Sequence, residues 1–529
     1  MFNKGDYDSL QSELQEFQES FFQLTSEDTD IEEDWERFKS ALKTSADRNI
    51  PSKMVSGRSK LPWLSARLRR LIRRKNRIQA KYKKTSNHRP YTLWRKLRRK
   101  VTCLLRSERN KHLNQVIGDI QTNPKPFWNY IRSQKKDNQV MPPLKTPTGT
   151  IVDSDYEKAE TLNAQFQNHW SHEDLNSVPF LRKTTPGIGN IVVTTNGIIK
   201  LLKDLKASKS AGPDEIHPYI LKESSAQVAP FLKYIFQKSL ETSKLPEDWR
   251  VATICPIYKK GDRSCPNNYR PVSLTSVVCK VLEHIVCSNI MNHLDAHGLI
   301  TSRQHAFHKG RSCTTQLCTV IHDWSKTIDQ GLQTDVFILD FAKAFDSVPH
   351  ERLKAKLFRY GINGKTLAWI NNFLCQRHQR VAINGSKSDW TPVISGVPQG
   401  TVLGPVLFNI FINDIVDEVE SEIRLFADDC VCYRPIAKVQ DCEQLQQDID
   451  HLSSWAKKWY MCFEPSKCKI MRITCKTTHK ITYQYTMEHT NLESAQHMKY
   501  LGVTISDDLR WNRHVADITG RANKLLGLP

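Results

Sequence analysis

Two adjacent aspartates, Asp428 and Asp429, are the first residues of this sequence that could do chemistry. They interrupt the stretch IRLFADDCVCY, in which short apolar runs precede and follow them. This pattern predicts a β-hairpin with both carboxylates at its turn. Adjacent negative charges repel each other, and Mg²⁺ offsets that repulsion because hard cations prefer carboxylate oxygens. An acidic turn is also commonly just a solvated turn, so the pair alone leaves both interpretations open.

A third aspartate, Asp340, ends the apolar run VFILD, which is typical of a buried strand. The helix-like segment AKAFDSV follows, so the Asp340 carboxylate is either an N-cap or a metal ligand. Asp346, inside that segment, is expected only to cap or pair locally. Further along, SGVPQGTVLGPVLF is rich in Gly and Pro, which let backbone approach a ligand closely, and Gln399 offers an amide in its middle.

The order and spacing of these three motifs resemble the polymerase palm of reverse transcriptases. They are most similar to the enzymes of non-LTR (LINE-type) retrotransposons of the jockey-like kind, and the resemblance covers the chain from about Trp128 onwards. It implies an α+β right-hand polymerase with fingers, palm and a partial thumb, after a helical, basic N-terminal extension. It also implies a fragment of a mobile-element protein that lacks the N-terminal endonuclease of such elements.

The reaction that this resemblance implies is nucleotidyl transfer, in which a primer 3′-hydroxyl attacks a dNTP and expels pyrophosphate. Two Mg²⁺ (or Mn²⁺) ions about 4 Å apart activate the hydroxyl and neutralise charge on the phosphate. One carboxylate cannot hold two cations at that spacing, so Asp340, Asp428 and Asp429 are expected to serve together as catalytic metal ligands. Lys467 matches the residue proposed to protonate the departing pyrophosphate. It lies in FEPSKC, where the family commonly has FNPSKC, so Glu464 is a departure.

Residues that bind the nucleotide are expected on both sides of the palm. The predicted strand VATICPIY leads into KKGDRSCPNNYRPVSL, where three cations are placed on a loop to hold the triphosphate. Arg270 is favoured among them because its planar fork matches phosphate oxygens. By the resemblance, Phe345 lies beneath the sugar and excludes a ribose 2′-hydroxyl. The full nucleotide-binding set is Lys259, Lys260, Arg270, Phe345, Gln399 and Gly400.

The segment QHAFHKGRS resembles one usually written Q-x-G-F-R-x-G-R-S, thought to contact the template side. The chain departs from it at Ala306, which restricts the backbone, and at His308, which is mostly neutral at pH 7. Both departures are expected to weaken the template grip. Lys309 and Arg311 are expected to compensate.

Residues 58–111 contain about twenty Lys and Arg residues and one acid, Glu108, with four aromatic residues interleaved. Such a run is commonly a solvated helix face, or a helix paired with the acidic segment before it. A run this long and of one sign favours contact with nucleic-acid phosphates, and its aromatic rings could stack on unpaired bases. The candidate contacts are Arg73, Arg74, Arg98 and Arg99. The same clusters are a weak signal for nuclear import, so residence in the nucleus at the integration site is expected.

The chain divides into five predicted parts. Residues 171–196 are the best linker candidate, and the spacing of apolar residues before residue 50 predicts an amphipathic helix packed on protein. SAGPDEI matches the segment that opens the fingers. The parts are 1–57, an acidic helical segment; 58–135, the basic nucleic-acid-binding extension; 136–196, a connector with one helix; 197–497, fingers and palm; and 498–529, the primer grip and the start of a truncated thumb.

The composition is consistent with this interpretation. The formal charge of +21 and pI near 9.3 suggest a polyanionic partner, although charge alone would equally suit an anionic membrane surface. No apolar run reaches membrane-spanning length and the start is no signal peptide, so RNA template, DNA primer and dNTPs are the expected partners, with no membrane. The 14 cysteines lack C-x-x-C spacing, which indicates reduced, intracellular thiols.

Two rival functions stay open at this point. An RNA-dependent RNA polymerase shares the palm, but Phe345 argues against it. A degenerate element-derived copy would bind RNA or DNA without polymerising. The intact aspartates argue against that rival, whereas the truncated thumb and the altered QHAFHKGRS argue for it.

Overall fold

The computed structural model describes residues 2–26, 28–52, 63–85, 88–118, 120, 126–128, 130, 141–182, 185–475 and 480–526. Its helices and strands form an α+β fold with two compact units. The main unit comprises Met1–Pro51 and Pro142–Pro529, and the basic unit comprises Ser52–Met141. Each is described by itself.

A five-stranded sheet in the order β14-β11-β5-β10-β9, here the β5 sheet, carries the predicted acidic motifs. Neighbouring strands are antiparallel except β11 and β14, which are parallel. The strands are β5 (Gln333–Asp340), β9 (Glu422–Phe426), β10 (Asp429–Ile436), β11 (Lys469–Ile473) and β14 (Glu493–Ser494).

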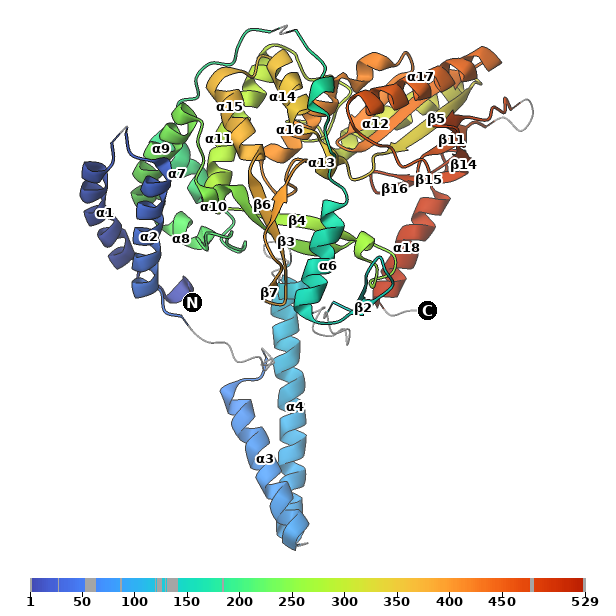
Figure 1. The fold of residues 1–529 in the computed structure, drawn as a ribbon. Coiled ribbons are helices and arrows are strands. Elements are labelled where there is room, and N and C mark those ends of the chain that lie inside the picture. The colour runs from blue at the N-terminus through green and yellow to red at the C-terminus, as the bar shows by residue number, and fades with distance from the viewer. Residues whose placement is uncertain are drawn as a thin grey trace. The chain divides into compact units, whose positions relative to one another are not determined.

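Both faces of the β5 sheet are covered (Figure 1). Phe337 and Leu339 belong to the large core that includes α17 (Val439–Lys458). Val336, on the opposite face, packs in a second cluster with Trp324 of α12 (Cys313–Asp329). Burial on both sides explains why β5 is a continuous apolar run rather than an alternating one, as predicted.

A second sheet, the β3 sheet, has the order β4-β3-β6-β7, with β8 also paired to β6. Arg270 is the second residue of β4 and pairs with Ile257, so its predicted position on a loop is wrong. The ladder extends to the pair Tyr258–Tyr269, which confines the loop to residues 259–268. The strands are β3 (Val251–Tyr258), β4 (Tyr269–Leu274), β6 (Arg377–Ile383), β7 (Ser386–Lys387) and β8 (Thr391–Val393).

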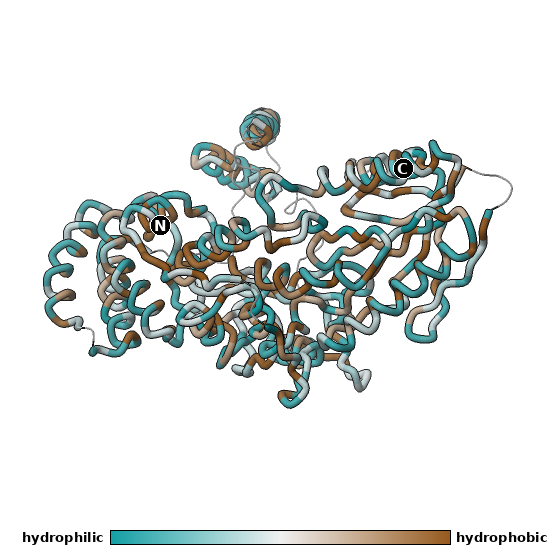
Figure 2. The backbone as a smooth tube through the Cα atoms, turned by 90° about the horizontal axis from the view of Figure 1, so that it is seen from above, coloured by the Kyte–Doolittle hydropathy of each residue, from teal (hydrophilic) through white to brown (hydrophobic). Residues whose placement is uncertain are grey.

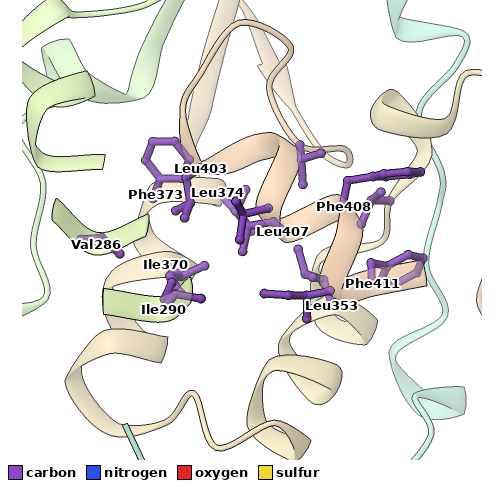
Figure 3. Close-up of a cluster of buried hydrophobic side chains, with 14 of the residues drawn as sticks. Val286, Ile290, Leu353, Ile370, Phe373, Leu374, Leu403, Leu407, Phe408 and Phe411 are labelled. Carbon is purple, nitrogen blue, oxygen red and sulfur yellow. The ribbon is translucent and has the colours of Figure 1, made fainter. Parts of the chain in front are cut away.

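Helices surround a shared apolar core. Figure 3 shows its centre, where Leu407 and Phe411 of α16 lie near Leu353, Ile370 and residues of α11. Every residue from Val406 to Ile412 in α16 is buried, because neighbouring elements cover this helix on all sides. The helices of this part are α6 (Asp155–Gln167), α7 (Thr195–Lys203), α8 (Pro218–Glu223), α9 (Ser225–Thr242), α10 (Glu247–Arg250), α11 (Val277–Ala296), α13 (Ala344–Ser347), α14 (His350–Arg359), α15 (Gly364–Leu374) and α16 (Leu403–Ile412).

The acidic N-terminal segment forms two helices, α1 (Tyr7–Leu24) and α2 (Ile31–Asn49), that pack on α9. Phe21 of α1 contacts Phe231 of α9 with ring centroids 5.0 Å apart. The buried Asp34 carboxylate accepts a hydrogen bond from Lys238 Nζ at 2.7 Å. The predicted amphipathic packing is therefore confirmed. Figure 2 shows the hydropathy that underlies it, with hydrophilic outer helices and hydrophobic interior segments.

The segment 171–196, expected to be a linker, is fastened to the main unit in its described part. Ser171 N–H donates to Ser395 Oγ at 2.8 Å, and Arg352 Nη1 donates to Glu173 Oε1 at 2.8 Å. The Gly, Pro and Ser residues of this segment correspond to an irregular backbone, but that backbone is hydrogen-bonded to the rest of the main unit. Short elements complete the main unit: β1 (Leu144–Lys145), β2 (Ile151–Val152), β12 (Thr486–Met487), β13 (Thr490–Asn491), β15 (His497–Tyr500), β16 (Val503–Ser506), α18 (Asn512–Leu526) and the 3-10 turns Phe2–Lys4, Leu175–Ser177, Pro266–Asn268 and Asn413–Glu418.

The basic unit contains two packed helices, α3 (Ala66–Thr85) and α4 (His88–Gly118) (Figure 1). Leu68, Leu97 and Val101 are buried in it. The part of the predicted basic run before Trp63 lies outside the described residues. Across the described chain, no helix is both long and apolar enough to cross a bilayer.

Candidate active site

The predicted acidic residues meet at one end of the β5 sheet. β9 and β10 form a hairpin whose two-residue connection is Ala427 and Asp428, and Asp429 opens β10. On the other side of β10, Asp429 is the direct Cα partner of Asp340, the last residue of β5. The antiparallel register therefore brings residues that are distant in sequence to the same sheet end.

Negative charge accumulates at this end of the sheet. Partial burial raises the pKa of Asp428, and the Asp340 charge raises it further, while Arg270 and Lys259 oppose the shift. Desolvation by the surrounding protein raises the pKa of Asp429 to about 6, and the charges of Asp428 and Asp340 contribute to this shift. Asp429 nevertheless keeps part of its surface exposed to solvent. A site in which carboxylates disfavour one another's ionisation is suited to a cation, which relieves that repulsion.

The three carboxylates fit a divalent ion by donor type and by backbone placement. In the described residues, no three His, Cys, Asp or Glu side chains converge closely enough to hold an ion as they stand. Like charges repel, so closer convergence of Asp340, Asp428 and Asp429 requires a cation between them.

Lys467 reaches the acidic end through a loop that docks on β5. Glu464 N–H donates to the Asp340 carbonyl at 2.9 Å, and the rings of Phe341 and Phe463 stack with centroids 4.5 Å apart. Lys467 Nζ consequently lies 3.9 Å from Asp340 Oδ2 and 3.5 Å from Glu464 Oε2. Glu464, the departure from FNPSKC, therefore shares this ammonium group with Asp340.

Cations from β4 and from the loop after β3 act on the aspartates, and Lys343 in the turn after β5 lies near these cations. Lys259 and Arg270 lower the pKa of both Asp428 and Asp429. Sequence reasoning missed Lys343, whose φ is +50° and whose pKa is lowered by burial and by the charges of nearby cations. Its only signal was its place three residues after Asp340. The remaining predicted cation of the loop, Lys260, is exposed.

The residues that were expected around the sugar contact other residues of the protein. The Phe345 ring stacks on Phe408 with centroids 4.5 Å apart and planes at 19°. Gln399 Nε2 donates to Asp346 Oδ1 at 2.9 Å, so the partner of Asp346 is distant in sequence rather than the local one that was expected. Gly400 has φ +105°, and a Cβ there would lie 2.8 Å from the Ser273 carbonyl oxygen, so only glycine fits.

The site lies in a part of the chain that matches a known protein family. Residues 257–505 match the family of reverse transcriptases (RNA-dependent DNA polymerases), and this range contains all three aspartates and Lys467. Residues 257–505 therefore form a reverse transcriptase domain.

Related proteins come from mobile elements of Drosophila melanogaster. The probable RNA-directed DNA polymerase from transposon BS is 23% identical, over 87% of this chain and 53% of its own length. The RNA-directed DNA polymerase from mobile element jockey is 24% identical, over 98% of this chain and 58% of its own. The corresponding probable polymerase from transposon X-element is 24% identical over 85% and 51%. The chain spans about half the length of these relatives.

Within the reverse transcriptase domain, the two cations of the segment QHAFHKGRS have different surroundings. Lys309 is exposed, whereas Arg311 Nη1 donates to the carbonyl oxygens of Ser302 at 2.9 Å and Gln304 at 2.5 Å. The positive φ angles of the segment fall on Phe307, at +54°, and on Gly310, at +79°, rather than on Ala306. Ala306 therefore occupies its buried position without the backbone strain expected from the lost glycine.

In the basic unit, the four predicted arginines Arg73, Arg74, Arg98 and Arg99 are exposed. Its aromatic rings instead contact one another. The ring centroid of Tyr91 lies 5.2 Å from that of Tyr82 and 5.9 Å from that of Trp94. The Arg98 guanidinium lies 5.3 Å from the Trp94 ring centroid. These rings are packed between helices, so the expectation that they stack on bases is not supported by their placement.

Proposed function

We propose that this chain is an RNA-directed DNA polymerase that transfers nucleotides from dNTPs to a primer 3′-hydroxyl by a two-metal mechanism. The observation that carries the proposal is the register that pairs Asp429 with Asp340 at one sheet end, inside a reverse transcriptase domain. The related proteins named as RNA-directed DNA polymerases support it.

In this proposal the β5 sheet is the palm and the β3 sheet belongs to the fingers. The hairpin β15–β16, which overlaps the start of the predicted primer-grip part 498–529, follows the palm strands in the chain. α18 begins the thumb. Packing of Met498, Tyr500 and Ile505 with Val431 and Met471 of the β5 sheet supports a primer grip anchored on the palm.

Asp340, Asp428 and Asp429 would hold two Mg²⁺ ions. Bound there, the ions lower the pKa of the primer hydroxyl and neutralise charge on the phosphate and the leaving group. Lys467 Nζ, held between Asp340 and Glu464, donates a proton to the departing pyrophosphate. Arg270, Lys259 and Lys343 offset the triphosphate charge from the opposite side.

Phe345 selects deoxynucleotides in this proposal. Its ring is fixed by stacking on Phe408, which is fully buried, so it cannot move aside for a ribose 2′-hydroxyl without disturbing the core. Phe345→Val is therefore expected to raise incorporation of rNTPs. Competition between a dNTP and the matching rNTP measures the change, and unchanged discrimination contradicts the role.

The basic unit holds template RNA through phosphate contacts by Arg73, Arg74, Arg98 and Arg99. We also propose that these clusters direct the protein to the nucleus, where a chromosomal target lies. A tagged protein that stays outside nuclei while its basic unit is accessible contradicts this part of the proposal.

The test is primer extension on an RNA template with Mg²⁺ and dNTPs, beside the double variant Asp428→Asn/Asp429→Asn. Extension by the unmodified chain alone supports the polymerase. Failure of both proteins, with RNA still bound at low salt, overturns the proposal in favour of a protein that only binds nucleic acid.

A further inference from the structure

The turn that carries Asp428 has a conformation that its own sequence disfavours. Ala427 occupies the first position of the two-residue connection with φ +54°, whereas Asp428 is not among the residues with positive φ. A positive φ at the first position only is the pattern of a type II′ hairpin turn, in which glycine is preferred. An L-residue there pays a steric penalty, so surrounding contacts must hold the turn.

Gln304 supplies such a contact. Its side chain is 1% exposed, and its Oε1 accepts hydrogen bonds from the Ala427 N–H at 3.1 Å and the Ala306 N–H at 2.9 Å. Both partners are donors, so the amide must present its oxygen to them. Its Nε2 is buried without a hydrogen-bond partner in the described chain. Gln304 therefore bonds to the turn through Oε1 even though this orientation leaves its Nε2 without a partner.

The backbone around Gln304 is attached to the same hairpin. Gln304 forms a parallel bridge with Leu425 of β9, and the Leu425 N–H and carbonyl bond to Arg303 and His305 at 3.0 Å each. This segment thus lies along the outer edge of β9. The bridge to Leu425 fixes the backbone of Gln304, and with it the Cα position of Gln304, beside the end of β9.

Two further side chains hold this segment from outside the sheet. Arg311 Nη1 donates to the Gln304 carbonyl, and Asn409 Nδ2 of α16 donates to the Ala306 carbonyl at 2.8 Å. The backbone is consequently held at Gln304 itself and again two residues later. A side chain anchored in this way can impose a geometry on the turn rather than follow it.

We propose that Gln304 is a positioning residue for nucleotidyl transfer, whose amide oxygen fixes the Ala427–Asp428 turn and thereby the direction of the Asp428 and Asp429 carboxylates. The inference rests on the proposed function and deepens it. It gives the first residue of QHAFHKGRS a role in the acidic site that is separate from template contact. Arg311 acts one step further away, through the Gln304 backbone.

The test replaces Gln304 by methionine, which keeps the length of the side chain but cannot accept these two hydrogen bonds. The matched control is Gln333→Met. Gln333 is also buried, and its amide bonds to Asp335 and the Ile481 carbonyl at the opposite end of β5. The readouts are kcat in primer extension, Mn²⁺ binding by electron paramagnetic resonance, and the midpoint of thermal unfolding.

Gln304→Met is expected to lower kcat about 100-fold, because a misplacement of about 1 Å in catalytic groups has that effect. It should also weaken Mn²⁺ binding about tenfold, since misdirected ligands lose affinity on the scale of about 10–100-fold. Gln333→Met should lower the unfolding midpoint while kcat and Mn²⁺ binding stay near those of the unmodified chain. Equal effects of the two variants on Mn²⁺ binding overturn the proposal.

A second comparison uses Ala427→Gly, because glycine adopts the turn without an external hydrogen bond. Gln304→Met should lower kcat about tenfold less in a chain that already carries Ala427→Gly than in the unmodified chain. An equal loss in both backgrounds contradicts the proposal. If the unmodified chain does not extend a primer, the proposed function fails, whereas Mn²⁺ binding and thermal unfolding still decide whether Gln304 positions the turn.

Discussion

The basic unit, residues 52–141, contains 26 lysines and arginines and 3 acidic residues, whereas the rest of the chain contains 51 and 53. The net charge of +21 therefore comes from the basic unit, and the main unit is close to neutral. In the main unit, oppositely charged side chains pair in the interior: Asp34 with Lys238 at 2.7 Å, and Lys356 with Asp414 at 2.6 Å. In the basic unit, charges of one sign cover the exposed surface of α3 and α4.

This difference separates two uses of charge. Exposed charges of one sign attract any polyanion and lose strength as salt increases. Charges that are paired in the interior hold elements at defined positions, and removal of one partner leaves the other buried and unpaired. The acidic end of the β5 sheet is a third case, since the charges of Asp428 and Asp340 there raise the pKa of Asp429. We infer that binding strength lies mainly in one unit and geometry for chemistry in the other.

The sharpest test of this division is Asp340→Asn. Loss of one metal-holding carboxylate removes several kcal/mol of charge stabilisation, so primer extension should fall roughly 1000-fold. RNA affinity, measured by filter binding, should not change. Asp335→Asn on the same strand is the control, because Asp335 is buried and accepts a hydrogen bond from the Tyr485 hydroxyl at 2.8 Å. It should lower stability but keep extension. A parallel loss of RNA binding in Asp340→Asn would break the division.

The next largest effect is expected from Lys467→Met. Loss of a general acid typically slows turnover about 100-fold or more, and the loss should appear in kcat. Single-turnover incorporation on a preformed primer–template complex measures it. Glu464→Gln provides the contrast, since it removes the carboxylate 3.5 Å from Lys467 Nζ but leaves the ammonium group in place. Equal kcat for Lys467→Met and the unmodified chain rules out the proton-donor role.

A smaller effect, confined to binding, is expected when the four arginines of the basic unit are replaced by glutamine. The slope of log affinity for single-stranded RNA against log salt should decrease by about 3, given about 0.7 per phosphate contact. Turnover at saturating template should be preserved. The matched control replaces four exposed lysines of the main unit, and the slope should then stay unchanged. The two sets are Arg73, Arg74, Arg98 and Arg99, and Lys200, Lys203, Lys206 and Lys209.

The smallest effect concerns stability at Asp429. Its pKa is raised to about 6 in the folded state, so the folded protein binds this proton more tightly than the unfolded chain does. The ionised form therefore lowers the free energy of unfolding above about pH 6, and that penalty disappears as the pH falls toward 4. Asp429→Asn should raise the unfolding midpoint by about 1–2 °C at pH 7.5 and leave it unchanged at pH 4. A rise at both values would point to a cause other than charge.

The sequence by itself determined the local elements of the site. The apolar run that ends at Asp340, the hairpin interrupted at Asp428, and the strand VATICPIY were all predictable, because burial and turn formation leave period and composition signals over a few residues. The order of the three motifs also indicated the reverse transcriptase family before any fold was known.

Only the tertiary structure decided which distant residues meet. The Asp340–Asp429 pairing depends on the register of β5 and β10, and a shift of one residue would turn each side chain to the other face. The docking of Glu464 on Asp340, the attachment of residues 171–196 and the contact of Gln304 with Ala427 are likewise long-range. Local pattern carries no signal for such pairs, because the two partners lie far apart in the sequence.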